Sequence, residues 1–386
     1  MSAESPVYLD YAATSPVDPQ VAAAMSECLT RDGVFGNPSS MHQHGRLART
    51  RVERARTQVA ALIHAEPQQL LWTSGATESN NLAILGTARA AARRGRHLVS
   101  ARTEHKSVID ACRRLEHEGF DVTWLDTDRE GLIAPERVHE ALREDTVLVS
   151  IMHANNETGV LQDIEAIAAI CQQRAVPLHV DAAQSAGKLA VDVTRLHCDL
   201  LSFTAHKLYG PKGVGALYFA PSRRASLQPL LFGGGQERGL RPGTLAVHQI
   251  VGFGVACELA GAAWQRDAAH CERLRARLWQ GLECIDGVLL NGHPTRRVAG
   301  ILNVSFTGIE GESLLMGLTE LSLSTGSACN SDSDEPSYVL RALGRNTELA
   351  QSSLRFSLGR YSEEQDIERA IAAVTRELRR LRAAAP

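Results

Sequence analysis

Short apolar runs alternate with longer amphipathic stretches between about residues 68 and 220. We predict strands at QLLWTSG, HLVSA, TVLVSIM, PLHVD and DLLSF, because each run is short, apolar and bounded by polar or Gly-containing turns. Residues 77–93, 107–118 and 163–175 place Leu, Ile and Ala at helical spacing. The alternation predicts βα units around a mainly parallel sheet, an α/β fold that binds ligands where its strands end.

The pattern changes near residue 245. A helical stretch runs from there to about Cys284, followed by a strand at ILNVSF, an acidic helix start, a strand at LRFSL and a final basic helix. This mixture predicts a second, smaller α+β domain. We expect the boundary near residue 260, with a large α/β domain at 15–260 and a small domain made of 1–14 and 261–386.

The charges of the chain nearly cancel, since 41 Lys and Arg residues stand against 44 Asp and Glu residues. With 44% hydrophobic and 22% charged residues, the composition is typical of a globular protein and excludes a disordered one. The balance gives no electrostatic footprint for nucleic acid. The longest uncharged apolar stretch, 242–257, is shorter than the roughly 18 residues that indicate a membrane span. We therefore expect direct binding neither to nucleic acid nor to a membrane.

The first residues of the chain have neither a basic start nor an apolar run, so we predict no signal or transit peptide. The eight cysteines are scattered and include no C-x-x-C pair. No group of His and Cys has the spacing of a zinc site, and we predict no metal. These observations favour a cytoplasmic protein with reduced thiols.

A lysine and a carboxylate each follow a predicted strand. Lys207 lies just past DLLSF, and Asp181 ends PLHVD. An aldehyde cofactor such as pyridoxal phosphate needs an amine for a Schiff base and a carboxylate that keeps its pyridine nitrogen protonated. The turn at Gly75, Ala76 and Thr77 lies between a strand and a helix, where backbone N–H groups can bind a phosphate. The same turn lacks the patterns of nucleotide-binding loops.

The chain resembles the pyridoxal-phosphate-dependent cysteine desulfurases, in the fold-type-I, class V aminotransferase group. The resemblance is carried, in chain order, by YLDYAATSPVDP, SGATESNN, TEHKSVID, NNETGVLQD, VDAAQSAGK, AHKLYGPKG, RPGTLAVH, STGSACNS, EPSYVLRALG and LRFSLGRYS. These motifs span nearly the whole chain. STGSAC, with no histidine before the cysteine, is similar to the housekeeping and nitrogen-fixation group. A fold-type-I transferase with a large and a small domain is thereby implied.

The resemblance implies roles for the residues that match the family's motifs. Lys207 would form the Schiff base, Asp181 would pair with the ring nitrogen and Gln184 with the ring hydroxyl. His105 would stack on the ring and exchange protons. The implied phosphate-binding residues are Ala76, Thr77, Thr204, His206 and, across a homodimer interface, Thr244. Asn156 is implied both at the cofactor and, together with Arg355, at the substrate carboxylate.

The implied reaction converts L-cysteine into L-alanine. Lys207 would remove the α-proton, His105 would deprotonate the incoming thiol, and the thiolate of Cys329 would attack the substrate sulfur, leaving a persulfide on Cys329. The small and polar residues around Cys329 suit a nucleophile that carries sulfur to an acceptor protein. The other cysteines that we compared lie in apolar or helical contexts and are predicted to be inert: Cys112, Cys171, Cys198, Cys257 and Cys271.

Two features leave the sulfur acceptor open. Asp332, Asp334 and Glu335 make the stretch after Cys329 acidic, and we hypothesise that they tune the choice of partner. Pro386 follows closely on the predicted last helix, whereas housekeeping members carry a longer tail that docks an iron-sulfur scaffold. Iron-sulfur assembly, tRNA thiolation, DNA phosphorothioation and cofactor sulfuration are all compatible with the motifs.

Two rival functions are weighed against this interpretation. A selenocysteine lyase, or another class V enzyme such as an aminotransferase, would also use Lys207 and Asp181. A scaffold that has lost catalysis would have no need of the full set of residues. Cys329 discriminates, because simple transamination needs no thiol.

Overall fold

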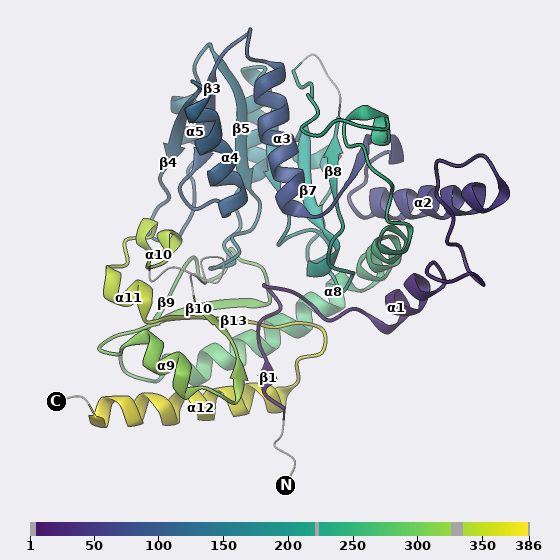
Figure 1. Cartoon of the computed structure of the whole chain (residues 1–386). Helices are drawn as coiled ribbons and strands as arrows, with labels where there is room; N and C mark the ends of the chain where they lie inside the picture. Colours follow the sequence, from purple (N-terminus) through teal and green to yellow (C-terminus); the bar gives the residue numbers. More distant parts are fainter. Residues whose placement is uncertain (1–4, 221–223, 326–334, 385–386) are drawn as a thin grey trace.

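The computed structural model describes residues 5–220, 224–325 and 335–384. A seven-stranded sheet, a four-stranded sheet, a two-stranded sheet and a long connecting helix organise this part of the chain (Figure 1). Among the described residues, no helix combines the length and the apolar character that crossing a membrane requires.

A seven-stranded sheet forms the larger unit, with the strand order β2-β8-β7-β6-β5-β3-β4. The pairs from β4 through β3, β5 and β6 to β7 are parallel, and β8 runs antiparallel to both β7 and β2. The fold prediction is confirmed, as are the five predicted strands; β4 and β8 were not predicted. The strands are β2 (Leu70–Thr73), β3 (His97–Ala101), β4 (Asp121–Leu125), β5 (Thr146–Met152), β6 (Leu178–Asp181), β7 (Leu200–Thr204) and β8 (Gly215–Phe219).

Helices cover both faces of this sheet because its strands are apolar on both sides. On β3, Leu98 belongs to the hydrophobic cluster that includes α3 (Ala76–Ala90) and α4 (Lys106–His117). Its neighbour Val99 belongs to the cluster of the opposite face, which includes α2 (Gln43–Leu62) and α6 (Ile164–Gln173). Shorter helices complete the unit: α1 (Pro19–Ser26), α5 (Pro135–Ala141) and α7 (Val193–Leu196). Figure 1 shows α2 projecting sideways from the sheet.

The smaller unit has a four-stranded antiparallel sheet, β12-β13-β10-β9, beside a parallel pair of β1 and β11. Its strands are β1 (Val7–Tyr8), β9 (Val288–Leu290), β10 (Ile301–Phe306), β11 (Leu321–Ser322), β12 (Ser324–Thr325) and β13 (Ser353–Ser357). Its helices are α9 (Gly311–Gly317), α10 (Tyr338–Ala342), α11 (Thr347–Gln351) and α12 (Glu364–Ala384). The start of the chain thus packs in one hydrophobic cluster with α12, and Figure 1 shows β1 beside that helix.

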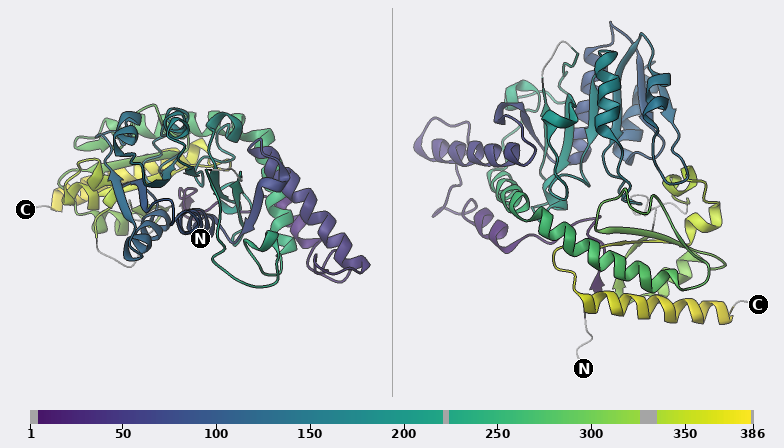
Figure 2. Two further views of the ribbon diagram at one scale, coloured as in Figure 1. Left: turned by 90° about the horizontal axis from the view of Figure 1, so that it is seen from above. Right: turned by 180° about the vertical axis from the view of Figure 1, so that it is seen from behind.

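Helix α8 (Val247–Glu283) links the two units. Its first part packs in the hydrophobic cluster under the large sheet, and its last turns pack in the cluster of the small sheet with α12. Figure 2 shows the helix running obliquely from one sheet to the other. The predicted helix from residue 245 to about Cys284 is confirmed.

Candidate active site

A pocket of about 580 Å³ lies where the strands of the large sheet end and the small unit begins. Loops after β2, β3, β5, β6 and β7 all contribute to its wall, as a parallel sheet requires. The pocket brings together most of the residues singled out in the sequence: Ala76, Thr77, His105, Asn156, Asp181, Gln184, Thr204, His206, Lys207 and Arg355.

Asp181 is buried at the carboxyl end of β6. Its Oδ2 accepts a hydrogen bond from Asn80 Nδ2 at 2.7 Å, and its Oδ1 accepts one from the Ala183 N–H at 2.9 Å. These donors stabilise a carboxylate. Asn80 was not among the predicted site residues. Its position one turn into α3 was the only indication in the sequence that it could belong to the site, and only the fold brings it to Asp181.

His105 begins α4 as its N-cap. Its Nδ1 accepts the Ser107 N–H at 3.2 Å and lies 2.8 Å from Ser107 Oγ. The Ser107 hydroxyl can either donate to or accept from Nδ1, so Ser107 holds this nitrogen in either tautomer of the imidazole. Ser107 therefore controls which nitrogen of His105 can exchange a proton.

Lys207 ends a short 3-10 turn, η2 (Ala205–Lys207), directly after β7. Its Nζ donates to the carbonyl oxygens of Ala12 and Ala13 at 2.5 and 2.6 Å. The amine is thus held in the pocket by a segment from the start of the chain. Composition and motifs could not predict this contact, because the partners are nearly two hundred positions apart.

Gln184 is fixed at both ends of its amide. Its Nε2 donates to Ala12 O at 2.8 Å, and its Oε1 accepts from Lys188 Nζ at 2.8 Å. Burial, with help from the nearby charge of Lys207, lowers the pKa of Lys188 to about 7. Lys188 was not among the predicted site residues, although it follows Gln184 by four positions, the spacing of one helical turn.

The first turn of α3 forms one end of the pocket. Ala76 and Thr77 open the helix, so their N–H groups have no partner within it. Gly215 lets this turn approach the sheet, because a Cβ there would lie 2.7 Å from Gly75 Cα. Burial and neighbouring lysines lower the pKa of His206 to about 4, which leaves a neutral imidazole.

Arg355 projects from β13 of the small unit and is only 2% exposed. Its Nη1 donates to Asn156 O at 2.9 Å and its Nη2 to Asp10 Oδ1 at 2.8 Å. Among the described residues, Arg355 Nε and Asn156 Oδ1 are buried without a hydrogen-bond partner. Buried polar atoms of this kind are normally satisfied, so the pair is suited to receive a polar ligand.

Glu104 was not singled out in the sequence. Its side chain is fully buried beside His105, with Oε1 accepting the Met152 N–H at 2.8 Å. Burial, and to a lesser degree the charge of Asp181, raises the pKa of Glu104 well above its usual value. Burial thus favours the neutral form of this acid.

The pocket suits pyridoxal phosphate by its set of donors and acceptors. A carboxylate, an amide, an amine and a helix N-terminus line one cavity, and Asn156 and Arg355, each with a buried polar atom that has no partner among the described residues, line the same cavity. Thr244 is exposed and lies away from the pocket wall of its own chain. Cys329, with Asp332 and Asp334, lies outside the described residues.

Comparisons agree with this geometry. The family Aminotransferase class-V matches residues 7–370. Cysteine desulfurase IscS of Shewanella loihica is 52% identical over 382 residues, 99% of this chain and 95% of that protein. A solved structure described as a NifS-like protein has a TM-score of 0.91 at 35% identity, covering 97% of this chain and 100% of its own. SspA in complex with cysteine has a TM-score of 0.80 at 37% identity, covering 92% and 99%. The chain belongs to the class V aminotransferase family of pyridoxal-phosphate enzymes and, within it, to the cysteine desulfurases.

Proposed function

We propose that the chain takes sulfur from L-cysteine with the help of pyridoxal phosphate, releases L-alanine and holds the sulfur as a persulfide on Cys329. The observation that carries the proposal is a single pocket lined by Lys207, Asp181, His105 and Arg355. An amine, a carboxylate, an imidazole and a guanidinium are the groups that this chemistry needs.

Each pocket residue takes one task. Asp181 holds the ring nitrogen, Gln184 the ring hydroxyl, and the N–H groups of the first turn of α3 the phosphate, together with Thr204 and His206. The bound cofactor supplies an electron sink for the substrate's α-carbon. Arg355 and Asn156 hold the substrate carboxylate, and Lys207 removes the α-proton.

His105 exchanges a proton with the substrate thiol. The exchange takes place at Nε2, because Ser107 holds Nδ1 and its hydroxyl at 2.8 Å can either donate to or accept from that nitrogen. The thiolate of Cys329 then attacks the substrate sulfur. A sulfur–sulfur bond forms, the carbon–sulfur bond breaks, and its electron pair stays with the carbon skeleton, which takes up protons and leaves as L-alanine.

The chain on either side of Cys329 supports this assignment. Ser324 pairs with Arg355 in the small sheet, next to the pocket and five positions before Cys329. On the other side, the Tyr338 hydroxyl donates to Glu104 O at 2.8 Å, beside His105. Both flanks therefore start from the rim of the pocket, within the reach of a few residues of chain.

The active unit in this proposal is a homodimer. Thr244 would complete the phosphate site of the second copy, and its exposure in one chain suits that role. Large apolar side chains are exposed on the same connection to α8 and near α2: Leu231, Phe232, Phe35, Met41 and Leu47. Such side chains are typical of a protein interface.

The proposal includes a cytoplasmic enzyme whose chain divides at about residue 260. The hydrophobic cluster of the large sheet includes α8 up to Ala260, and the cluster of the small sheet includes α8 from Cys271 onward.

The described cysteines are free thiols, which fits a reducing compartment. Burial raises the pKa of Cys171 and Cys198 to about 12, so these thiols are poor nucleophiles. The acceptor is a protein, and the pathways left open by the motifs stay open.

Turnover of L-cysteine by the wild type and Cys329→Ala tests the proposal. We expect the wild type to bind pyridoxal phosphate and, with a reductant, to release alanine and sulfide in equal amounts. Cys329→Ala should keep the absorption of the bound cofactor and lose at least about a hundredfold in sulfide release. Cys284→Ala is the matched control, because Cys284 is exposed and lies on α8's C-terminal side. If Cys329→Ala released sulfide as fast as the wild type, the proposed persulfide on Cys329 would be wrong.

A further inference from the structure

A carboxylate lies beside the place where we expect a phosphate. Glu78 belongs to the first turn of α3 and lines the pocket together with Ala76 and Thr77. Its Oε2 accepts the Ser74 N–H at 2.7 Å, which fixes the carboxylate at the helix start. Like charges at close range repel strongly in a partly buried site, so an uncompensated Glu78 would oppose a phosphate there.

Arg241 compensates this carboxylate. Its Nε donates to Glu78 Oε1 at 2.8 Å and its Nη2 to Glu78 Oε2 at 3.1 Å, a two-pronged ion pair with each side chain 21% exposed. Burial by itself would raise the pKa of Glu78, but the hydrogen bonds from Arg241 and Ser74 outweigh it and the pKa is lowered. Glu78 is thus ionised, and Arg241 carries the balancing charge.

The loop that carries Arg241 is fixed independently of this ion pair. Glu237 accepts hydrogen bonds from Arg56 Nη2 at 2.7 Å and from the Trp72 N–H at 2.9 Å. Glu237 and Arg238 adopt left-handed φ angles of 47° and 62°, which non-glycine residues hold only when their surroundings enforce them. This enforced turn lies shortly before Arg241 in the chain, so the loop that carries Arg241 has anchors of its own.

We infer that Arg241 is a positioning residue for the cofactor phosphate, acting through Glu78 by cancelling its charge and not by binding the phosphate itself. The inference rests on the proposed function, since it presupposes a phosphate at the start of α3. It assigns a purpose to a charged pair that the reaction does not otherwise use. Removing Arg241 should therefore harm phosphate binding only as long as Glu78 carries a charge.

A double-mutant cycle tests the inference. The dissociation constant of pyridoxal phosphate is measured by absorption titration of the full-length protein freed of cofactor, for the wild type, Arg241→Met, Glu78→Gln and both changes together. We expect Arg241→Met to weaken binding at least about tenfold. The double variant should return to within about threefold of the wild type. Arg241→Lys, which keeps the cation, should lose much less than Arg241→Met.

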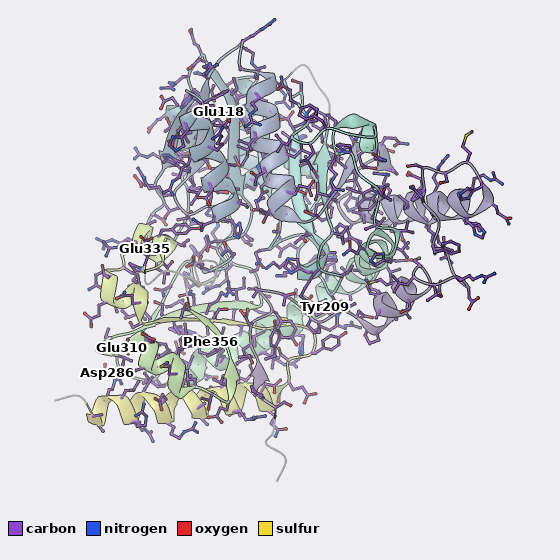
Figure 3. The ribbon with its side chains drawn as sticks, in the orientation of Figure 1. Glu118, Tyr209, Asp286, Glu310, Glu335 and Phe356 are labelled. Atoms are coloured by element: carbon purple, nitrogen blue, oxygen red, sulfur yellow. The ribbon has the colours of Figure 1, made fainter. Side chains whose placement is uncertain are left out.

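Pyridoxal without its phosphate separates this effect from a general disturbance of the pocket. Its affinity should be the same in the wild type and in Arg241→Met, because the repulsion requires the phosphate. Arg89→Met is the control for losing a bidentate pair on α3, since Arg89 binds Glu118 at 2.7 and 3.0 Å. Figure 3 labels Glu118 at the outer end of the large unit, well away from Tyr209, which follows Lys207 by two positions.

The outcomes are distinct. If the double variant still binds pyridoxal phosphate as weakly as Arg241→Met, Arg241 binds the phosphate directly. If Arg241→Met binds pyridoxal phosphate as tightly as the wild type, Glu78 needs no compensation. Either result overturns the inference. Failure of the wild type to bind pyridoxal phosphate at all would instead overturn the proposed function. Circular dichroism of each variant identifies any that has not folded; if Arg241→Met does not fold, Arg241→Gln replaces it in the cycle.

Discussion

Individual polar side chains of the pocket are set by partners from distant parts of the chain. Lys188 is an example, because its Nζ fixes Gln184 Oε1 while Lys207, Arg355 and Cys271 lie close enough to affect its charge. Burial is the main cause that lowers its pKa to about 7. A lysine near that value changes charge under the conditions in which the enzyme is handled.

The stability of the cofactor-free protein should report this titration. The unfolded chain holds the Lys188 proton up to about pH 10.4, whereas the folded chain releases it near pH 7. Between these values the unfolded state binds more protons, so stability rises with pH. We predict that the urea midpoint of the wild type rises relative to that of Lys188→Met between pH 7 and about pH 9.5.

Lys106→Met is the control for that measurement, because Lys106 lies on the surface and pairs with Asp110. Its midpoint should follow the wild type across the same pH range. Parallel curves for the wild type and Lys188→Met would show that the buried amine keeps an ordinary pKa.

At the scale of elements, α8 joins the two units and packs closely on α2. Gly254 makes this approach possible, because a Cβ there would lie 2.8 Å from Ala55 Cα on α2. Gly261, farther along the same helix, is exposed, and an added Cβ would meet only Leu62 Cδ1 at 3.9 Å. Close packing therefore leaves no space for a side chain at Gly254, whereas Gly261 has that space.

Alanine at these two positions should act in opposite directions. We predict that Gly254→Ala lowers the free energy of unfolding by about 1–3 kcal/mol, since backbone and not a flexible side-chain end blocks the new methyl group. Gly261→Ala should raise it by about 0.5–1 kcal/mol through helix propensity. Urea unfolding gives the free energy of unfolding of both variants. A higher free energy of unfolding for Gly254→Ala would contradict the close packing of α2 and α8.

Prediction of the elements succeeded where apolar runs were continuous. HLVSA, TVLVSIM and ILNVSF coincide with β3, β5 and β10. β4 was not predicted because Asp121 and Thr123 interrupt its apolar residues, as expected at the edge of a sheet. β8 was not predicted because the βα alternation anticipates a helix between parallel strands, whereas β8 returns antiparallel directly after the turn that holds Lys207.

The molecule as a whole exposes apolar side chains on the connection that also carries Thr244. Phe232 is 87% exposed there, and Figure 1 places this connection and α2 on the same side of the molecule. In the proposed homodimer these groups become buried, and Thr244 reaches the phosphate of the second copy. Assembly and cofactor binding should then be linked.

We predict that Phe232→Asp shifts the protein from dimer to monomer in sedimentation velocity and weakens pyridoxal phosphate binding at least about tenfold. A charge at the centre of an apolar interface is costly to bury, which is the reason for the shift. Met316→Asp is the matched control, because Met316 on α9 is 70% exposed and far from that connection. A dimeric Phe232→Asp with normal cofactor affinity would exclude this face from the interface.

The sequence by itself determined the α/β class, the strand ends that carry Lys207 and Asp181, and the motifs that indicate the family. These follow from local patterns, because a strand, a turn and a motif are each formed by neighbouring residues. Only the tertiary structure decided that Ser107 holds Nδ1 of His105, that burial raises the pKa of Glu104, and that Arg241 compensates Glu78. Those properties depend on burial and on distances between residues that lie far apart along the chain, and they exist only once the chain has folded.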